Sequence, residues 1–274
     1  SAVIAAVALF ASFIETIGNE DEAYSGLVGS PDPITGEIRT VFDVVQVNVS
    51  DPKQFIGLLI GGSVAFLFSA LAIRAVSRTA NVVVQEVRNQ FADGKIMSGE
   101  KLPDYGPVID ICTTASLREL ATPALLAVLT PVIVGFGISS LALGAFLAAV
   151  ILTGQLMANF LSNSGGAWDN AKNIEDGHYG GKGSDAYRAA VIGDTIGDPF
   201  KDTAGPALNP LIKVMNLVSL LMLPAIISLQ DNDAARYSIA AAALVVLLGA
   251  ILYSKRGGAT LASAEPVSET VTAG

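Results

Sequence analysis

The chain has 274 residues, of which 51% are hydrophobic and only 15% are charged, and its mean hydropathy is +0.56. Soluble domains usually carry about 25% charged residues, so this composition excludes an ordinary water-soluble enzyme and a disordered acidic protein. The net charge of −9 disfavours nucleic acid as a partner. The single cysteine, Cys112, cannot form an internal disulfide. We therefore expect an integral membrane protein, surrounded by a lipid bilayer.

Six apolar stretches are long enough to cross a membrane, because a spanning helix needs roughly 20 apolar residues. In chain order they are 1–17, 55–73, 120–138, 141–161, 203–229 and 237–254. Lipid cannot satisfy free backbone N–H and C=O groups, so each stretch is expected to be helical. The sequence therefore predicts an all-α, multi-pass membrane protein with a bundle of about six transmembrane helices. Residues 255–274 are small and polar and are predicted to form a disordered tail.

The first stretch, 1–17, lacks the basic region and the cleavage context of a signal peptide. It begins without a polar lead-in or an initiating methionine, so we expect the chain to begin inside a longer protein. An acidic connection, 18–53, follows it. We interpret this connection as a solvated acidic loop, with metal binding as the alternative, although no ligand spacing recurs there.

The connections differ in their lysine and arginine content. Connections 74–119 and 162–202 and the residues after 254 together hold twelve lysines and arginines, whereas the other connections hold three. Because basic connections stay in the cytoplasm, the first set is predicted to be cytoplasmic. We expect a prokaryotic plasma membrane.

The second span is predicted to continue as a helix beyond the bilayer, because apolar positions recur at every third or fourth residue from Val76 to Phe91. Arg74 and Arg78 lie one turn apart at its cytoplasmic edge. They either extend to the lipid headgroups or have a functional role.

Charged side chains are concentrated in the cytoplasmic segment 165–202. The stretch GGAWDNAK places Asp169 and Lys172 three residues apart, just after a span. The stretch GDTIGDPFKD places Asp194, Asp198 and Asp202 at successive steps of four, each about 40° further round a helix.

Like charges on one helix face repel each other unless something neutralises them. Mg²⁺ is the natural candidate, because it prefers carboxylate oxygens and shares its coordination with substrate phosphates. Lys172 and Lys201 would then contact phosphate oxygens as point charges. The spacing predicts a metal and anion site at the cytoplasmic membrane face. The alternative is a solvated acidic loop with ordinary lysines at the membrane edge.

Two further features, within residues 165–213, leave alternatives open. Gly193, Gly197 and Gly205 allow close backbone approach, either to a ligand or to a neighbouring helix. Lys213 lies roughly three turns into the fifth span, where an amine usually faces a polar cavity or a carboxylate. It belongs either to a structural ion pair or to an ion pathway that leads from the acidic site.

The chain resembles the membrane-bound, ion-translocating pyrophosphatases. The matching stretches include PDYGPVIDICTTAS, SNSGGAWDNAK and GSDAYRAAVIGDTIGDPFKDTAGPALNPLIK. The resemblance implies a fold of about sixteen membrane helices, of which this chain matches the C-terminal part. It also implies hydrolysis of Mg²⁺-bound pyrophosphate at the cytoplasmic face, coupled to pumping of H⁺ or Na⁺. A homodimer is expected, and K⁺ is a second cofactor that the resemblance allows.

The resemblance also implies roles for the carboxylates. Asp169, Asp198 and Asp202 match carboxylates of the Mg²⁺–pyrophosphate site, and Asp194 matches an essential acidic position nearby. Asp202 also resembles one of the two aspartates that activate the attacking water. These matches make Asp194, Asp198 and Asp202 the candidate catalytic residues.

Three lysines match as well. Lys172 and Lys201 match lysines that contact phosphate, and Lys213 matches the lysine of the ion gate below the site. The family commonly has a second lysine directly after Lys172, where this chain has Asn173. An upstream acidic motif of the family has no match here.

Two competing hypotheses remain. A cation channel or secondary transporter with an acidic cytoplasmic vestibule would explain the carboxylates and Lys213, but not the interleaved lysines. A purely structural chain, inert alone, is the third possibility.

Overall fold

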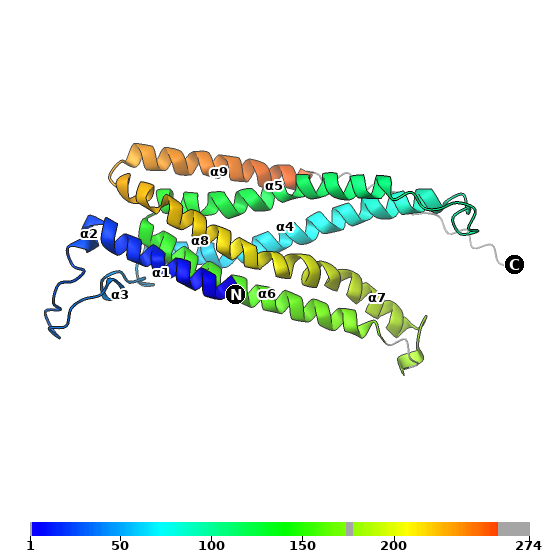
Figure 1. Cartoon of the computed structure of the whole chain (residues 1–274), viewed down its shortest axis with the longest axis horizontal. Coiled ribbons are helices and arrows are strands. Elements are labelled where there is room, and N and C mark those ends of the chain that lie inside the picture. Colours follow the sequence, from blue (N-terminus) through cyan, green and yellow to red (C-terminus); the bar gives the residue numbers. More distant parts are fainter. Residues whose placement is uncertain (1, 174–177, 257–274) are drawn as a thin grey trace.

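The computed structural model describes residues 2–173 and 178–256, and nearly all of its regular structure is helical (Figure 1). The long helices are α1 (Ala2–Glu20), α4 (Pro52–Phe91), α5 (Gly106–Gly137), α6 (Ser140–Ala171), α7 (Asp185–Asp198), α8 (Gly205–Ser228) and α9 (Asp233–Arg256). The short elements are α2 (Glu22–Ser25), α3 (Val41–Val44), the 3₁₀ turn η2 (His178–Gly180) and the π-helical turn η3 (Pro199–Ala204). Because η3 joins α7 to α8, the long helices form six continuous rods.

All six rods are long and apolar enough to cross a membrane, which confirms the predicted all-α membrane class. Some rods are longer than the predicted spans, because polar residues continue the helix beyond its apolar residues. The α4 helix, for example, continues to Phe91, as its apolar spacing predicts. The predicted tail falls mostly on residues 257–274, which lie outside the described residues, whereas Lys255 and Arg256 end α9.

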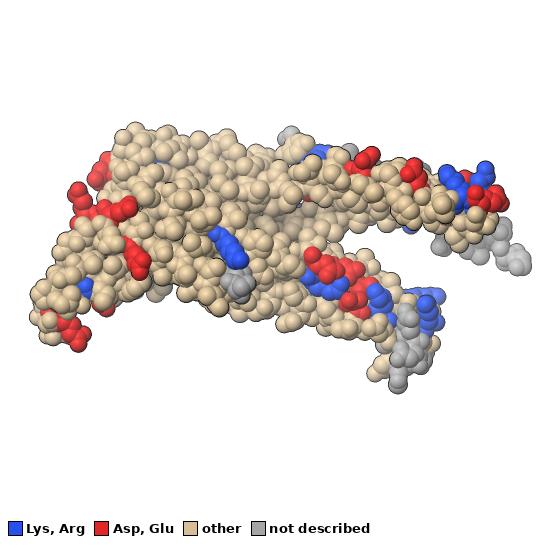
Figure 2. Space-filling view, viewed as in Figure 1, with Lys and Arg blue, Asp and Glu red and all other residues tan. Residues whose placement is uncertain are grey.

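The connections fall into two groups in space. The α4–α5 and α6–α7 connections lie at one end of the molecule, which we call the basic end (Figure 1). The α2–α3 segment and the α5–α6 and α8–α9 connections lie at the opposite end. Charged side chains are concentrated towards the two ends, and the middle is mostly uncharged on the face in Figure 2. This arrangement is typical of a protein whose middle part lies in lipid.

Two glycines bring α4 and α6 into backbone contact. A Cβ atom at Gly57 would collide with the carbonyl oxygen of Ala142, and one at Gly61 would collide with that of Phe146. The two glycines are four residues apart, as are their two partners. Small residues at this spacing let membrane helices approach closely, because lipid supplies little hydrophobic drive and packing must supply the attraction.

The last helix, α9, is fastened to α5 near both ends. At the end opposite the basic end, Arg236 donates from Nε to the carbonyl of Phe136 at 3.0 Å and from a terminal nitrogen to that of Ile138 at 2.6 Å. Near the C-terminal end of α9, the Arg118 guanidinium donates to the Tyr253 hydroxyl at 3.1 Å. Since the last carbonyls of a helix have no partner within it, Arg236 satisfies groups that lipid would leave unpaired.

The carboxylates of the acidic loop satisfy backbone donors. Asp21 and Asp51 accept N–H groups at the starts of α2 and α4. Asp32 accepts the N–H of Thr35 and of the residue before it, and Nε of Arg39 lies 3.2 Å from its other oxygen. These hydrogen bonds, first that from Thr35, hold the pKa of Asp32 below its usual value. Among the described residues, no loop carboxylate belongs to a group of three that could hold a metal.

Beyond the predicted bilayer, the extended ends of α4 and α5 are joined by an ion pair. Arg78 donates from Nε to Glu119 at 3.2 Å, and a terminal nitrogen of Arg78 pairs with the other carboxylate oxygen. Gln90 binds both the N–H and the carbonyl of Asp104, at 2.9 and 2.8 Å. Arg78 therefore has a protein partner, whereas Arg74 is exposed.

Candidate functional site

The site is built where α6 meets α7 without intervening side chains. A Cβ atom at Gly165 would lie 2.5 Å from the carbonyl oxygen of Gly197 and 2.9 Å from the amide nitrogen of Lys201. Trp168 on α6 lies over this contact, and its ring packs against that of Phe200 with the centroids 5.6 Å apart. Gly197 therefore serves contact between helices, which resolves one of the alternatives that the sequence left open.

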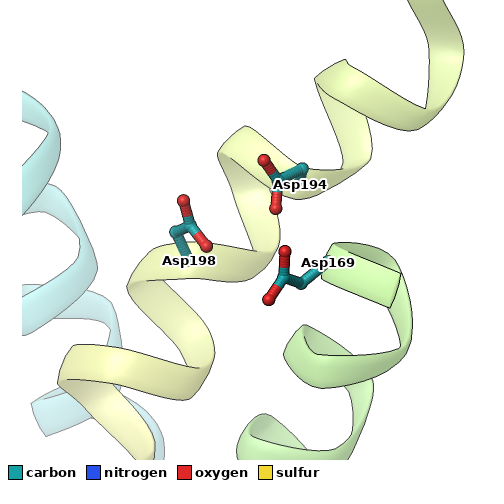
Figure 3. A group of neighbouring side chains, drawn as sticks. All are labelled: Asp169, Asp194 and Asp198. Carbon is teal, nitrogen blue, oxygen red and sulfur yellow. The ribbon is translucent and has the colours of Figure 1, made fainter. Parts of the chain in front are cut away.

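Three carboxylates meet across this contact. Asp169 extends from α6, and Asp194 and Asp198 extend from α7 towards it (Figure 3). Each offers an oxygen, and these three oxygens lie within 4.8 Å of one another. We call these residues the carboxylate triad. Two members come from the predicted step of four along one helix, and the third comes from the helix beside it.

Asp194 is the buried member of the triad. Its residue surface is 8% exposed, whereas the Asp169 and Asp198 side chains are 40% and 51% exposed. One oxygen of Asp194 accepts from Lys172, but Oδ1 is buried and has no hydrogen-bond donor among the described residues. A buried carboxylate oxygen without a donor is costly unless a cation or another donor reaches it.

Lys172 connects two members of the triad at the end of α6. Its Nζ lies 2.7 Å from Oδ2 of Asp194 and 3.5 Å from Oδ1 of Asp169. The hydrogen bond to Asp194 raises the pKa of Lys172 above its usual value, and the charge of Asp194 acts in the same direction. Lys172 is therefore held as a cation beside the triad.

Lys201 connects the rest of the cluster from the π-helical turn. Its Nζ lies 2.8 Å from Oδ1 of Asp198, 2.7 Å from Oδ2 of Asp202 and 3.5 Å from Oδ2 of Asp169. Only 21% of its side chain is exposed. One ammonium group therefore contacts carboxylates from both helices.

Asp202 lies outside the triad, because the helix widens before it. In η3 the amide of Gly205 donates to the carbonyl of Phe200, five residues back, instead of four. Pro199 begins this turn and has no N–H to continue the regular pattern. The Asp202 side chain is 66% exposed and joins the cluster through Lys201. Such π-helical turns often occur at functional sites.

Lys213 lies away from the cluster. It follows Asp202 by eleven residues on the same rod, roughly 16 Å along the axis at the α-helical rise. Its side chain is exposed on α8, and it forms no ion pair within the described part of the chain. The structure thus brings six of the seven predicted residues together and leaves Lys213 separate.

This geometry suits an anion that carries a divalent cation. The triad offers oxygen ligands of the kind that Mg²⁺ prefers, with one oxygen already removed from water. Lys172 and Lys201 offer ammonium groups beside these oxygens, and ammonium groups bind phosphate oxygens as point charges. The ion pairs between the ammonium and carboxylate groups are enough to explain why these charges lie together.

The chain is similar to one described protein family and to several named proteins. The family model described as "Inorganic H+ pyrophosphatase" matches residues 1–222, which include the whole cluster and Lys213. The "K(+)-insensitive pyrophosphate-energized proton pump" of Streptomyces avermitilis is 53% identical over 268 residues. Proteins with the same name from Streptomyces coelicolor and Chloroflexus aurantiacus are each 51% identical, over 264 and 235 residues.

These matches cover most of this chain but a minor part of each relative. The two Streptomyces alignments cover 94% of the chain and 32% of the relative, and the Chloroflexus alignment covers 85% and 29%. The chain therefore spans about a third of the length of the curated relatives that it matches.

Proposed function

Because this chain belongs to the inorganic H⁺ pyrophosphatase family, we propose that it forms one wall of a site that hydrolyses pyrophosphate to two phosphates. We propose further that this hydrolysis drives H⁺ across the membrane. The relatives are named as pyrophosphate-energized proton pumps, which supports H⁺ rather than Na⁺. The observation that carries the proposal is the carboxylate triad with two ammonium groups in direct contact with it.

Mg²⁺ is the proposed cofactor. Asp169, Asp194 and Asp198 would hold it, and the buried, unpaired Oδ1 of Asp194 supports this fit. When bound, Mg²⁺ would neutralise negative charge on the pyrophosphate oxygens. The relatives' names describe them as K⁺-insensitive, so the proposed activity does not require K⁺.

The remaining site residues have separate proposed roles. Lys172 and Lys201 bind phosphate oxygens and orient the substrate, because both ammonium groups lie within the carboxylate cluster. Asp202, the most exposed carboxylate of the cluster, accepts a proton from the attacking water. The water oxygen bonds to one phosphorus, the bond from that phosphorus to the bridging oxygen breaks, and its electron pair leaves with the second phosphate.

We propose that Lys213 couples hydrolysis to transport. It is an exposed amine within the apolar part of α8, and such an amine is costly in lipid unless it faces a polar path or a carboxylate. Replacing Lys213 with alanine should therefore lower H⁺ transport. Wild-type rates of both hydrolysis and transport in this variant would remove Lys213 from the mechanism.

The proposed orientation places the basic end in the cytoplasm of a prokaryotic cell. In a Cys112→Ser background, which removes the exposed native cysteine, the variant Lys95→Cys, in the α4–α5 connection, should then react with a membrane-impermeant maleimide only in inside-out vesicles. The variant Ile34→Cys, at a residue that is 92% exposed in the acidic loop, should react only in right-side-out vesicles. The reverse pattern would overturn the orientation. A homodimer is proposed from the family and is tested by the mass of the purified pump.

The function is best tested in a chimera. This chain would replace the segment of the Streptomyces avermitilis relative that it matches, so that the other parts of the pump are present. Inside-out vesicles with the chimera should hydrolyse pyrophosphate only with Mg²⁺ and should acidify while they do so. The parent pump serves as the positive control.

Insertion of the chimera is checked separately, by its resistance to alkaline extraction from membranes. Its assembly is checked by its elution volume in size-exclusion chromatography in detergent. A chimera that inserts and elutes as the parent does, but neither hydrolyses pyrophosphate nor pumps, would refute the proposal. A cation channel, in contrast, would conduct ions in these vesicles without pyrophosphate.

A further inference from the structure

A tryptophan beside the carboxylate triad lies in a groove of α7. Trp168 on α6 directly precedes Asp169 and is half-buried. A Cβ atom at Gly193 would lie 3.8 Å from Cγ of Trp168, and one at Gly197 would lie 3.2 Å from its Cβ. The two glycines are one turn apart on α7, so the space that they leave open is filled by this side chain. Gly193 therefore also serves contact between helices.

The ring of Trp168 connects α6 to the π-helical turn. It packs against the ring of Phe200 with the centroids 5.6 Å apart and the ring planes tilted by 43°, a geometry within the favourable range for aromatic pairs. Phe200 also supplies the carbonyl that accepts the N–H of Gly205, the five-residue hydrogen bond that widens η3. The contact with α6 is therefore made by a residue on which the wide turn depends.

The far end of η3 also lies against α6. A Cβ atom at Gly205 would lie 2.7 Å from Oγ of Ser162, so this glycine lets the turn end close to α6. Because π-helical turns are rare in proteins, we infer that the wide turn needs support from its neighbours. Helix α6 supplies contacts near both ends of the turn, with Trp168 near its start and Ser162 at its end.

The aromatic pair lies beside an ion pair that joins the same two segments. Asp169 follows Trp168 on α6, Lys201 follows Phe200 on η3, and Nζ of Lys201 lies 3.5 Å from Oδ2 of Asp169. The Asp169 side chain is 40% exposed, and an ion pair that is open to water contributes little to stability. An aromatic pair contributes packing that water does not screen. The rings are therefore the firmer of the two contacts.

We propose that Trp168 is a positioning residue: through Phe200 it holds η3 against α6, and so keeps the Lys201 ammonium where a phosphate oxygen of the substrate binds. This inference rests on the proposed function, because it takes Lys201 as a phosphate ligand. The carboxylate triad depends less on the rings, because its members precede η3 and meet across the backbone contact of α6 with α7. Loss of the rings should therefore weaken substrate binding more than Mg²⁺ binding.

The test is the KM for Mg²⁺-bound pyrophosphate, measured in vesicles with the chimera. Trp168→Ala should raise KM about tenfold, the factor expected when one aromatic pair is lost. It should keep the rise in melting temperature that Mg²⁺ alone produces in the purified chimera. Trp168→Phe keeps a ring in the groove, so its KM should be nearer to the wild-type value than to that of Trp168→Ala. An unchanged KM in Trp168→Ala, or loss of the Mg²⁺ response, would overturn the inference.

A double variant tests whether Trp168 acts through Lys201. Lys201→Ala should raise KM by itself, and the addition of Trp168→Ala should raise it no further, because the ammonium group is already absent. Phe160 provides the control: it is 59% exposed and precedes Trp168 by eight residues on α6, about 12 Å along the axis. Any effect of Phe160→Ala should multiply with that of Lys201→Ala. If the effect of Trp168→Ala multiplies in the same way, Trp168 does not act through Lys201.

A second measurement does not depend on activity. A structure of the detergent-solubilised chimera should show Nζ of Lys201 within about 4 Å of an Asp169 oxygen, and this distance should lengthen in Trp168→Ala. If that variant does not accumulate in membranes, Phe200→Leu replaces it, because it removes the other ring and keeps an apolar side chain. If the chimera is inactive, the proposed function fails, and this distance alone decides whether the rings hold η3. An unchanged distance would overturn the inference while the proposed function stands.

Discussion

Gly165 on α6 and Gly197 on α7 lie so close that a Cβ atom at position 165 would stand 2.5 Å from the Gly197 carbonyl oxygen. Backbone atoms cannot yield as a flexible side chain can. The two helices would therefore have to separate if either glycine gained a side chain. Asp169 follows Gly165 by one turn, so that separation would move one carboxylate away from the other two.

The first prediction concerns this contact. Gly165→Ala in the chimera should lower pyrophosphate hydrolysis about 100-fold, because a displacement of about 1 Å of a catalytic group has an effect of this size. Its neighbour Gly166 provides the control, since a Cβ atom there would meet no atom within 4 Å. Gly166→Ala should hydrolyse pyrophosphate at the wild-type rate. Equal rates in the two variants would show that the contact does not position the site.

The second prediction concerns the buried carboxylate. Asp194→Asn removes the charge that Lys172 contacts at 2.7 Å. It should lower hydrolysis by about 10²–10³, the usual cost of losing one electrostatic group in an active site. It should also remove the rise in melting temperature that Mg²⁺ produces in the purified chimera.

The control for this variant lies on the same helix. Asp185 begins α7 with a fully exposed side chain, which lies 3.5 Å from Arg188. Asp185→Asn should keep both the activity and the response to Mg²⁺, because exposed pairs of this kind contribute little. A normal Mg²⁺ response in Asp194→Asn would contradict the proposed metal site.

The third prediction concerns the attachment of α9. Arg236→Ala should destabilise the chimera by about 2 kcal/mol, because two carbonyls at the end of α5 lose a charged donor. Thermal unfolding in detergent measures this change. Arg188→Ala, at an arginine whose side chain is 73% exposed, should leave the melting temperature unchanged. An unchanged midpoint in Arg236→Ala as well would mean that apolar packing alone holds α9.

The fourth prediction concerns pH and the acidic loop. The pKa of Asp32 is lowered from 3.8 by its hydrogen bonds to backbone N–H groups. The stabilisation from these bonds is therefore present above the unfolded pKa and is lost as the pH falls through the lower, folded pKa. Hydrogen exchange in residues 30–39, corrected for the intrinsic rate, should become faster below about pH 3.8. Asp32→Asn should reduce this change, and an unaltered pH profile would exclude Asp32 as its cause.

Much of the fold could be predicted from the sequence, because lipid imposes helical structure on long apolar runs. The pairing of Asp194 with Asp198 could also be predicted, since a step of four places both on one helix face. That Asp169 joins them depends on contact between two helices. The sequence and the resemblance placed Asp169 in the same site, but neither gave the backbone contact that brings it there, because Gly197 could equally have faced a ligand.

The remaining features depend on geometry that side-chain spacing does not encode. A regular helix would have kept Asp202 on the stripe of Asp198, but the π-helical turn that begins at Pro199 changes its rotation. Arg236 was counted only as a charge in a short connection, whereas its importance lies in which carbonyls its planar group reaches. Roles of single residues such as Asp202 stay predictions until the variants are measured.

The glycine contacts between α4 and α6 have a mechanical consequence. With Gly57 and Gly61 seated against the backbone of Ala142 and Phe146, neither helix can slide past the other without a collision. These two helices therefore behave as one stiff frame. Further along α8, side chains such as Ile212, which lies against Gly154 of α6, make the contact and can change rotamer. Because the rod of α7, η3 and α8 is also held to α6 by backbone contact at Gly165, it could move along α6 only if that contact opened.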